Sequence, residues 1–308
     1  MIEAAADRGL FQRYADGSSQ IPRPSIEWLK RIVADEARPP QSLSLPTYGL
    51  ALQVLRMYFG VTWSERHIMD DSAPRGFLNQ WDDGGFRTNA SFRRIIDLAE
   101  MLVNMQNIPF IHNCMDQVQA GAIESAFAEL EVGKILFSAG KTFRYVTPVG
   151  KAKSDFDIAI NLYDLMWVCA DVKAKIESTA ISSGTIVKSL KRARSQLPDN
   201  FPGVVFLKLP SDWFTSPTIK LVTEGVGRFF NDTRHVVTVM AYFSHDRLQH
   251  GRVRTSLETA EYYNIKNRFG LGQMHLASGA DPLVRKSWID FEDLVGTELF
   301  GFPPLRRV

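Results

Sequence analysis

The spacing of apolar residues changes near residue 116 of the 308-residue chain. Before that point, apolar residues recur three and four positions apart, which is typical of amphipathic helices. Three stretches show this spacing: IEWLKRIVADEA, LPTYGLALQVLRMYFG and NASFRRIIDLAEMLVNMQ. After residue 116, short runs rich in β-branched and aromatic residues predict strands. The pattern therefore predicts a helical region over residues 1–115, followed by a region that mixes helices and strands.

The second region, predicted over residues 116–250, begins with one long helix over residues 116–141. Three strands are predicted next, at FRYVTPV, FDIAINL and MWVCADVKA. A helix at SGTIVKSLKRARSQL then precedes a fourth strand at GVVFLKLP, and a further strand lies near 235–243. The predicted fold is thus an α/β fold with a mixed sheet, built on an αβββαβ order. Residues 251–308 are expected to form a mixed extension packed on this core, with helices at ETAEYYNIKNRF and DFEDLVGTELF.

Composition places the chain among globular proteins, because 45% of its residues are hydrophobic and 23% are charged. No apolar run reaches the length of a membrane helix, and the first residues do not resemble a targeting peptide. Two cysteines, Cys114 and Cys169, are too few for a disulfide framework. We therefore expect a cytoplasmic protein without a membrane partner.

The net charge of +2 is unevenly distributed along the chain. Between Lys141 and Pro210 there are 11 Lys and Arg residues against 6 Asp and Glu residues, a surplus of +5. A local basic surface favours a polyanion such as nucleic acid, although a solvated charged face would have the same composition.

This basic segment also contains a pair of strands with charged residues inside them. If the strands form a hairpin that turns near Asp164, Asp157 lies opposite Asp171 and Asp155 lies opposite Lys173. Side chains alternate between the faces of a strand. One face is then predicted to carry Asp155, Asp157, Asp171, Lys173 and Lys175, and the other Phe156, Ile158, Ile160, Val168, Ala170 and Val172.

Two carboxylates held opposite each other repel, so this predicted arrangement needs a compensating charge. A divalent cation such as Mg²⁺ supplies it, because hard cations bind carboxylate oxygens. Lys173, two residues after Asp171, would then steady an attacking water or a developing negative charge. The alternative interpretation is the solvent-facing side of an ordinary hairpin.

The order of elements and these charges together resemble the PD-(D/E)xK nuclease superfamily, which has the restriction-endonuclease-like fold. The resemblance runs from Glu124 to Leu209. The superfamily places one acidic residue on the second strand, here Asp157, and an acid-x-Lys sequence on the third, here Asp171-Val172-Lys173. Ser154 stands where a proline often precedes the first acid, and Asp171 stands where Glu is common. These departures leave two candidates for the metal ligand. Asp157 is favoured because the predicted hairpin places it opposite Asp171, and Asp155 is the second choice.

Many members of the superfamily add a glutamate from the first helix. Glu129 is favoured here, because it shares a helical face with Ala122, Ala126 and Gly133, whose small side chains allow close packing. Glu124 and Glu131 lie on a different face. The resemblance thus implies the catalytic residues Asp157, Asp171, Lys173 and Glu129. The implied ligands of Mg²⁺ or Mn²⁺ are Asp157, Asp171 and Glu129, with Asp155 and Glu124 as second choices.

The second helix carries basic residues that could contact phosphates. Lys188, Lys191 and Arg192 lie on it, Gln196 follows at its end, and Lys175 precedes it; the resemblance lends a role beside the site to Lys191 and Gln196. The expected function is a metal-dependent nuclease. Endonuclease action is favoured over exonuclease action, and DNA is favoured over RNA as the substrate. The alternative is a catalytically silent nucleic-acid-binding or assembly subunit of the same fold. A homodimer, or a protein partner of the N-terminal region, is a further expectation.

Overall fold

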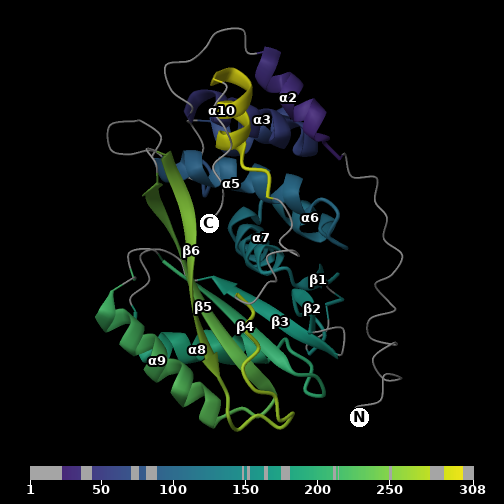
Figure 1. Ribbon diagram of the computed structural model, residues 1–308. Coiled ribbons are helices and arrows are strands. Elements are labelled where there is room, and N and C mark those ends of the chain that lie inside the picture. Colours follow the sequence, from purple (N-terminus) through teal and green to yellow (C-terminus); the bar gives the residue numbers. More distant parts are fainter. Residues whose placement is uncertain are drawn as a thin grey trace.

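The structure is a computed structural model in which a helical N-terminal region precedes a mixed sheet interleaved with helices (Figure 1). The residues it describes are 23–35, 44–70, 76–80, 89–147, 149–150, 153–162, 166–174, 181–210, 213, 215–249, 252–277 and 288–300. No helix within these ranges has the length and apolar character needed to cross a membrane. The α/β class predicted from the sequence is confirmed.

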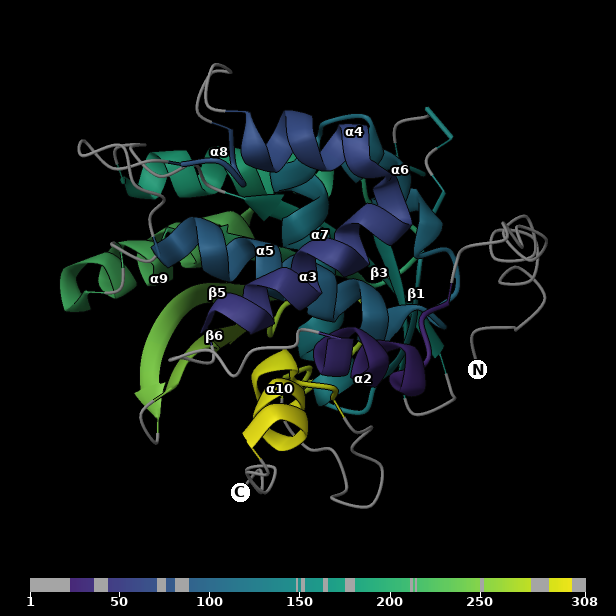
Figure 2. The same cartoon turned by 90° about the horizontal axis from the view of Figure 1, so that it is seen from above.

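All of the regular secondary structure described in the N-terminal region is helical, as the apolar spacing predicted. Its elements are α2 (Ile26–Asp35), α3 (Ser44–Phe59), α4 (Val61–Ser64), η1 (Glu65–Met69), α5 (Asn89–Met105) and α6 (His112–Gln119). Helix α6 extends across the boundary predicted at residues 115 and 116. Figure 2 shows α2 and α3 lying beside α10 (Phe291–Phe300), which packs against both.

The single long helix predicted over residues 116–141 is wrong, because two helices occupy this segment. Helix α6 ends at Gln119 and α7 runs over Ile123–Ser138. Gly121 lies between them with a φ of 92°, a left-handed conformation that favours glycine and ends the first helix. Gly140, with a φ of 66°, follows the end of α7 in the conformation typical of a helix C-cap.

Six strands form one sheet in the order β1-β2-β3-β4-β5-β6. Their bounds are β1 (Thr142–Tyr145), β2 (Ile158–Leu162), β3 (Met166–Ala174), β4 (Gly203–Leu209), β5 (Val236–Gln249) and β6 (Arg252–Tyr263). Strands β3, β4 and β5 are parallel, and the other neighbours are antiparallel. The parallel connections pass through α8 (Ser183–Arg194) and α9 (Ser216–Asn231). The αβββαβ order therefore appears as α7, β1, β2, β3, α8 and β4.

Each face of the sheet is covered by helices (Figure 1). On the first, here named the α7 face, residues such as Ile158, Ala170 and Phe206 pack with α7 and the N-terminal helices. On the second, the α8 face, Cys169 and Val205 pack with α8 and α9. Strands covered on both faces need long apolar runs, which explains why β3 and β4 are so readily visible in the sequence.

Two C-terminal features differ from the prediction. The stretch ETAEYYNIKNRF was predicted to be helical, but its first half belongs to β6, which pairs with β5 from Gln249 to Thr238. Helix α9 was not predicted, although Thr215 caps it and Pro217 stands in its first turn. The helix predicted at DFEDLVGTELF is confirmed as α10.

Candidate functional site

The β2–β3 hairpin has the register that a turn near Asp164 predicts, with Ile158 opposite Ala170 and Ile160 opposite Val168. The regular pairing ends at Ile158. The backbone N–H of Asp157 donates to the carbonyl of Ala170 at 2.9 Å, although Ala170 is already the partner of Ile158. Two residues facing one is the pattern of a β-bulge, which re-aims the side chains beside it.

This irregularity changes the predicted alternation of side chains. Phe156 packs on the α8 face, whereas Ile158 packs on the α7 face. The prediction that both residues share one face is therefore wrong, because strict alternation fails at the intervening Asp157. Such irregularities recur beside functional sites in sheets.

Asp157 lies just before β2, half-buried, and its side chain binds the neighbouring strand. Its Oδ2 accepts a hydrogen bond from the backbone N–H of Val172 at 2.6 Å. Burial raises the pKa of Asp157 to about 6, while Lys173 and the Val172 N–H act in the opposite direction. The Asp157 carboxylate thus takes the place of a backbone carbonyl as the acceptor for a β3 N–H group, and this holds the carboxylate close to β3.

Asp171 is fully buried in β3. Its Oδ2 forms an ion pair with Lys173 Nζ at 2.6 Å, but within the described part of the chain neither of its oxygens accepts a hydrogen bond of regular geometry. Burial and the charge of Asp157 raise the pKa of Asp171 well above its usual value, and Lys173 lowers it. Asp157 and Asp171 are therefore electrostatic neighbours, although the regular pairing of β2 with β3 ends at Ile158 and does not include them.

Asp155 has a local role in the structure. Its Oδ1 accepts a hydrogen bond from the backbone N–H of Val149 at 2.8 Å, which closes the loop before β2. The predicted pairing of Asp155 with Lys173 does not form, because the regular pairing of β2 with β3 ends at Ile158 and the Lys173 ammonium group binds Asp171.

Of the three glutamates weighed on the first helix, Glu129 is the one that faces the aspartates. Burial and the charge of Asp157 raise the pKa of Glu129 to about 8. Glu124 is exposed, and Glu131 forms a buried ion pair with Lys208 at 2.5 Å.

The partners of Glu129 come from helix α6 and were not predicted. Gln117 Nε2 lies 3.3 Å from both carboxylate oxygens, and Cys114 Sγ donates to Oε2 at 3.5 Å. Burial and the Glu129 charge raise the pKa of Cys114, so its thiol keeps the proton that it donates. The sequence signal was the spacing of Cys114 and Gln117, three residues apart on one helical face.

No group of three or more His, Cys, Asp or Glu side chains in the described ranges is arranged to hold a metal ion. The predicted three-carboxylate site of Asp157, Asp171 and Glu129 is therefore not assembled, because Glu129 is held by Gln117 and Cys114. Asp157 and Asp171 do suit a divalent cation. Mg²⁺ is usually bound through one or two carboxylates and keeps several waters, and the buried oxygens of Asp171 accept no hydrogen bond of regular geometry from the described residues.

The basic residues of α8 lie along its length. In a parallel crossover the helix runs back against the strands, so its N-terminal end lies towards the end of β3 that carries Lys173, while Lys191, Arg192 and Gln196 lie towards the other end. Lys188 and Arg192 are exposed, and Lys191 forms an ion pair with Asp232 at 3.0 Å. Lys175 lies outside the described residues.

Comparison of the chain with models of known protein families, with curated proteins and with solved structures gave no match.

Proposed function

We propose that this protein is a metal-dependent nuclease of the PD-(D/E)xK kind, which hydrolyses phosphodiester bonds in nucleic acid and acts on DNA in preference to RNA. The observation that carries the proposal is the environment of the Asp171 carboxylate. Its carboxylate is fully buried, interacts electrostatically with Asp157, accepts no regular hydrogen bond from the part of the chain that the structure describes, and is followed two residues later by Lys173. The αβββαβ order of the surrounding elements supports the same function.

A divalent cation would offset the cost of placing these two carboxylates together. Asp157 and Asp171 are the residues that would hold Mg²⁺ or Mn²⁺. Such a cation, when bound, lowers the pKa of a water and neutralises negative charge on the phosphate. The backbone N–H of Val172 fixes the carboxylate of Asp157 at 2.6 Å, so one side of this pair is preorganised by β3.

Lys173 would supply the positive charge at the reacting phosphate. Its side chain is 24% exposed, whereas that of Asp171 is 1% exposed, so the ammonium group lies between the buried acid and the surface. From this position it can orient a water or stabilise charge that develops on a phosphate oxygen. Glu129, which binds Gln117 and Cys114, would act as a positioning residue through water rather than as a direct ligand.

A catalytically silent nucleic-acid-binding subunit is the second candidate, and one observation favours it. Lys173 is already paired with Asp171 at 2.6 Å, an arrangement that balances the two charges without a cation. A silent protein would bind nucleic acid with the same salt dependence but would not cleave it.

The deciding experiment incubates the purified protein with end-labelled single- and double-stranded DNA and RNA, in EDTA, Mg²⁺ or Mn²⁺. We expect cleavage that requires a divalent cation and disappears in Asp171→Asn. Lys220→Gln, which removes an exposed charge from α9, is the matched control and should cleave normally. Binding without cleavage would support the silent alternative, and equal cleavage by Asp171→Asn would reject the proposed site.

A further inference from the structure

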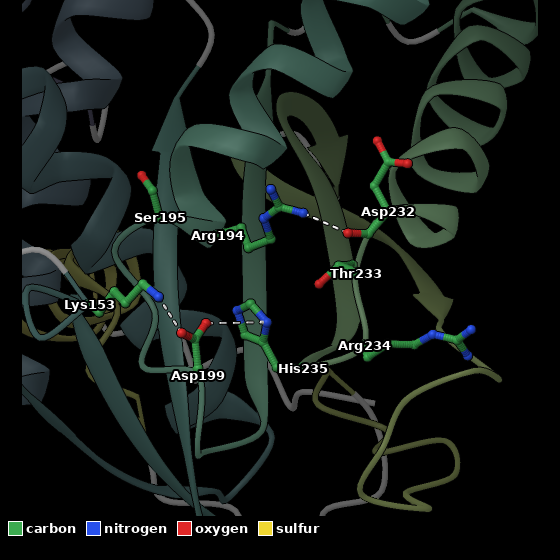
Figure 3. Close-up of a pocket in the computed structure, with 8 residues that line it drawn as sticks. All are labelled: Lys153, Arg194, Ser195, Asp199, Asp232, Thr233, Arg234 and His235. Carbon is green, nitrogen blue, oxygen red and sulfur yellow. Dashed lines mark hydrogen bonds and ion pairs between the residues drawn. The ribbon is translucent and has the colours of Figure 1, made fainter.

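A pocket of about 360 Å³ lies where the chain enters β4 and β5 (Figure 3). Its wall is formed by residues from three segments: Lys153 from the loop before β2, Arg194 from the last turn of α8, and Thr233 and His235 from the approach to β5. Its lining does not include Asp157, Asp171 or Lys173. The pocket is therefore a site separate from the proposed catalytic residues.

The hydroxyl of Thr233 marks the interior of this pocket. Thr233 is 4% exposed, and its Oγ1 has no hydrogen-bond partner among the described residues. Figure 3 shows this oxygen pointing toward the space between Arg194 and His235. A buried hydroxyl without a partner costs free energy, so a ligand that accepts its hydrogen bond would remove that cost.

The charges around the pocket favour an anion. Arg194 donates one N–H to the carbonyl of Asp232 at 2.7 Å, and a guanidinium carries several more donors. The two carboxylates of the lining are already paired, Asp199 with Lys153 and Asp232 with Lys191. These lysines lower the pKa values of both carboxyl groups. Arg268 adds positive charge near Asp199.

We propose that this pocket binds the phosphate group of a small ligand, of the size of a nucleoside monophosphate. A guanidinium and a hydroxyl are suitable donors for the oxygens of a phosphate. The volume is at the lower end of the range for small-molecule pockets and exceeds what a phosphate alone would fill. The proposal does not depend on nuclease activity, because it uses none of the proposed catalytic residues.

The test is calorimetric titration of the full-length protein with inorganic phosphate and, separately, with a deoxynucleoside 5′-monophosphate, both in EDTA. We expect binding that weakens roughly tenfold in Thr233→Val, which removes one hydrogen bond to a charged group and keeps the shape of the side chain. Arg194→Gln should weaken binding at least as much. Lys220→Gln and Asp171→Asn are the controls, and both should bind as the unsubstituted protein does.

Tighter binding of the nucleotide than of phosphate would mean that the sugar and base fill the rest of the pocket, and equal binding would mean that the phosphate alone is recognised. Both results support the proposal. Absence of binding up to about 10 mM of either compound would overturn it. It would also be overturned if Thr233→Val and Arg194→Gln, each folded by circular dichroism, bound both compounds with unchanged affinity.

Discussion

The Nζ atom of Lys173 lies 2.6 Å from Oδ2 of Asp171, two residues before it in β3. Residues two apart in a strand project from the same face, so this ion pair is formed within a single strand. It balances the charge of a buried carboxylate that accepts no regular hydrogen bond from any residue in the described ranges. A cation bound by Asp157 and Asp171 would compete with Lys173 for the same oxygens, which leads to a prediction for Lys173.

Replacing Lys173 by methionine should separate cation binding from cleavage. We expect Lys173→Met to bind Mn²⁺ at least as tightly as the unsubstituted protein, because the competing ammonium group is gone. Cleavage should fall about a hundredfold or more, as expected when a group that stabilises the transition state is lost. Calorimetric titration with Mn²⁺ and single-turnover cleavage measure the two effects.

The control for this variant is Lys220→Met, which removes an exposed lysine from α9 and should change neither measurement by more than a small factor. Unchanged cleavage by Lys173→Met would place the reacting centre elsewhere. Loss of Mn²⁺ binding would instead mean that the lysine holds Asp171 in its binding geometry.

Asp157 accepts a hydrogen bond from the backbone N–H of Val172, so the variants Asp157→Asn and Asp157→Ala should differ in stability. Asp157→Asn keeps an acceptor oxygen and should unfold with a free energy close to that of the unsubstituted protein in EDTA. Asp157→Ala leaves the N–H without its partner and should lose about 1–2 kcal/mol. Urea denaturation in EDTA measures this difference. Both variants should lose the stabilisation by Mn²⁺; if Asp157→Asn keeps it, Asp155 is the better ligand assignment.

The hairpin that carries these residues could be predicted because β2 and β3 are covered on both faces. Their apolar runs fix the strand positions, and a turn predicted near Asp164 gives the register, so the pairing of Ile158 with Ala170 follows from the sequence. The irregularity at Asp157 could not be predicted in this way. It depends on how the loop before β2 meets β3, and that meeting is a tertiary contact.

Other parts of the structure depend on partners that are distant in the sequence. The residues from Glu258 to Tyr263 form a strand because β5 extends to Gln249 and offers a paired edge. The local spacing of apolar residues gives no information about this strand pairing, and the same residues are compatible with a helix. Glu129 could be selected by its small neighbours, but its contacts with Gln117 and Cys114 require the turn between α6 and α7 at Gly121.

The environment of Glu100 predicts that the free energy of unfolding depends on pH, independently of the proposed site. Its two oxygens accept hydrogen bonds from Trp288 Nε1 at 3.1 Å and from the backbone N–H of Phe291 at 2.8 Å. Burial, and then the charge of Asp290, raise the pKa of Glu100 from 4.5 to about 8. Between these two values the folded protein keeps a proton that the unfolded chain has lost. The stabilisation from this proton is complete below pH 4.5 and is lost as the pH rises to about 8.

In Glu100→Gln the side chain stays neutral, so this contribution should vanish. The difference in unfolding free energy between the two proteins should therefore shift in favour of the variant as the pH rises, by up to about 1.4 kcal/mol per pH unit. Urea denaturation at pH 5, 6.5 and 8 measures it. Glu224→Gln, an exposed position on α9, is the control; a pH-independent difference for Glu100→Gln would mean that Glu100 is ionised in the folded protein.

Gly133 lets α7 approach β1, and it shares a helical face with Glu129 one turn earlier. A Cβ atom at Gly133 would lie 2.1 Å from the hydroxyl oxygen of Tyr145 and 3.0 Å from the sulfur of Met105. Tyr145 is 1% exposed, so its ring lies in the core and cannot turn towards solvent without disturbing the packing around it. We expect Gly133→Ala to destabilise the protein by about 2 kcal/mol, because overpacking exceeds the roughly 1 kcal/mol that alanine gains in a helix.

Two further variants make this prediction specific. Gly184→Ala lies in the exposed first turn of α8, where the nearest atom to an added Cβ is Ser182 Oγ at 3.6 Å, and should be neutral or slightly stabilising. Tyr145→Phe removes the hydroxyl that an alanine at position 133 would meet, so the double variant should recover part of the loss. Urea denaturation of Gly133→Ala, Gly184→Ala, Tyr145→Phe, the double variant and the parent tests both statements. If the double variant is no more stable than Gly133→Ala, the clash involves Met105 or the helix backbone, and Tyr145 does not set the distance between α7 and β1.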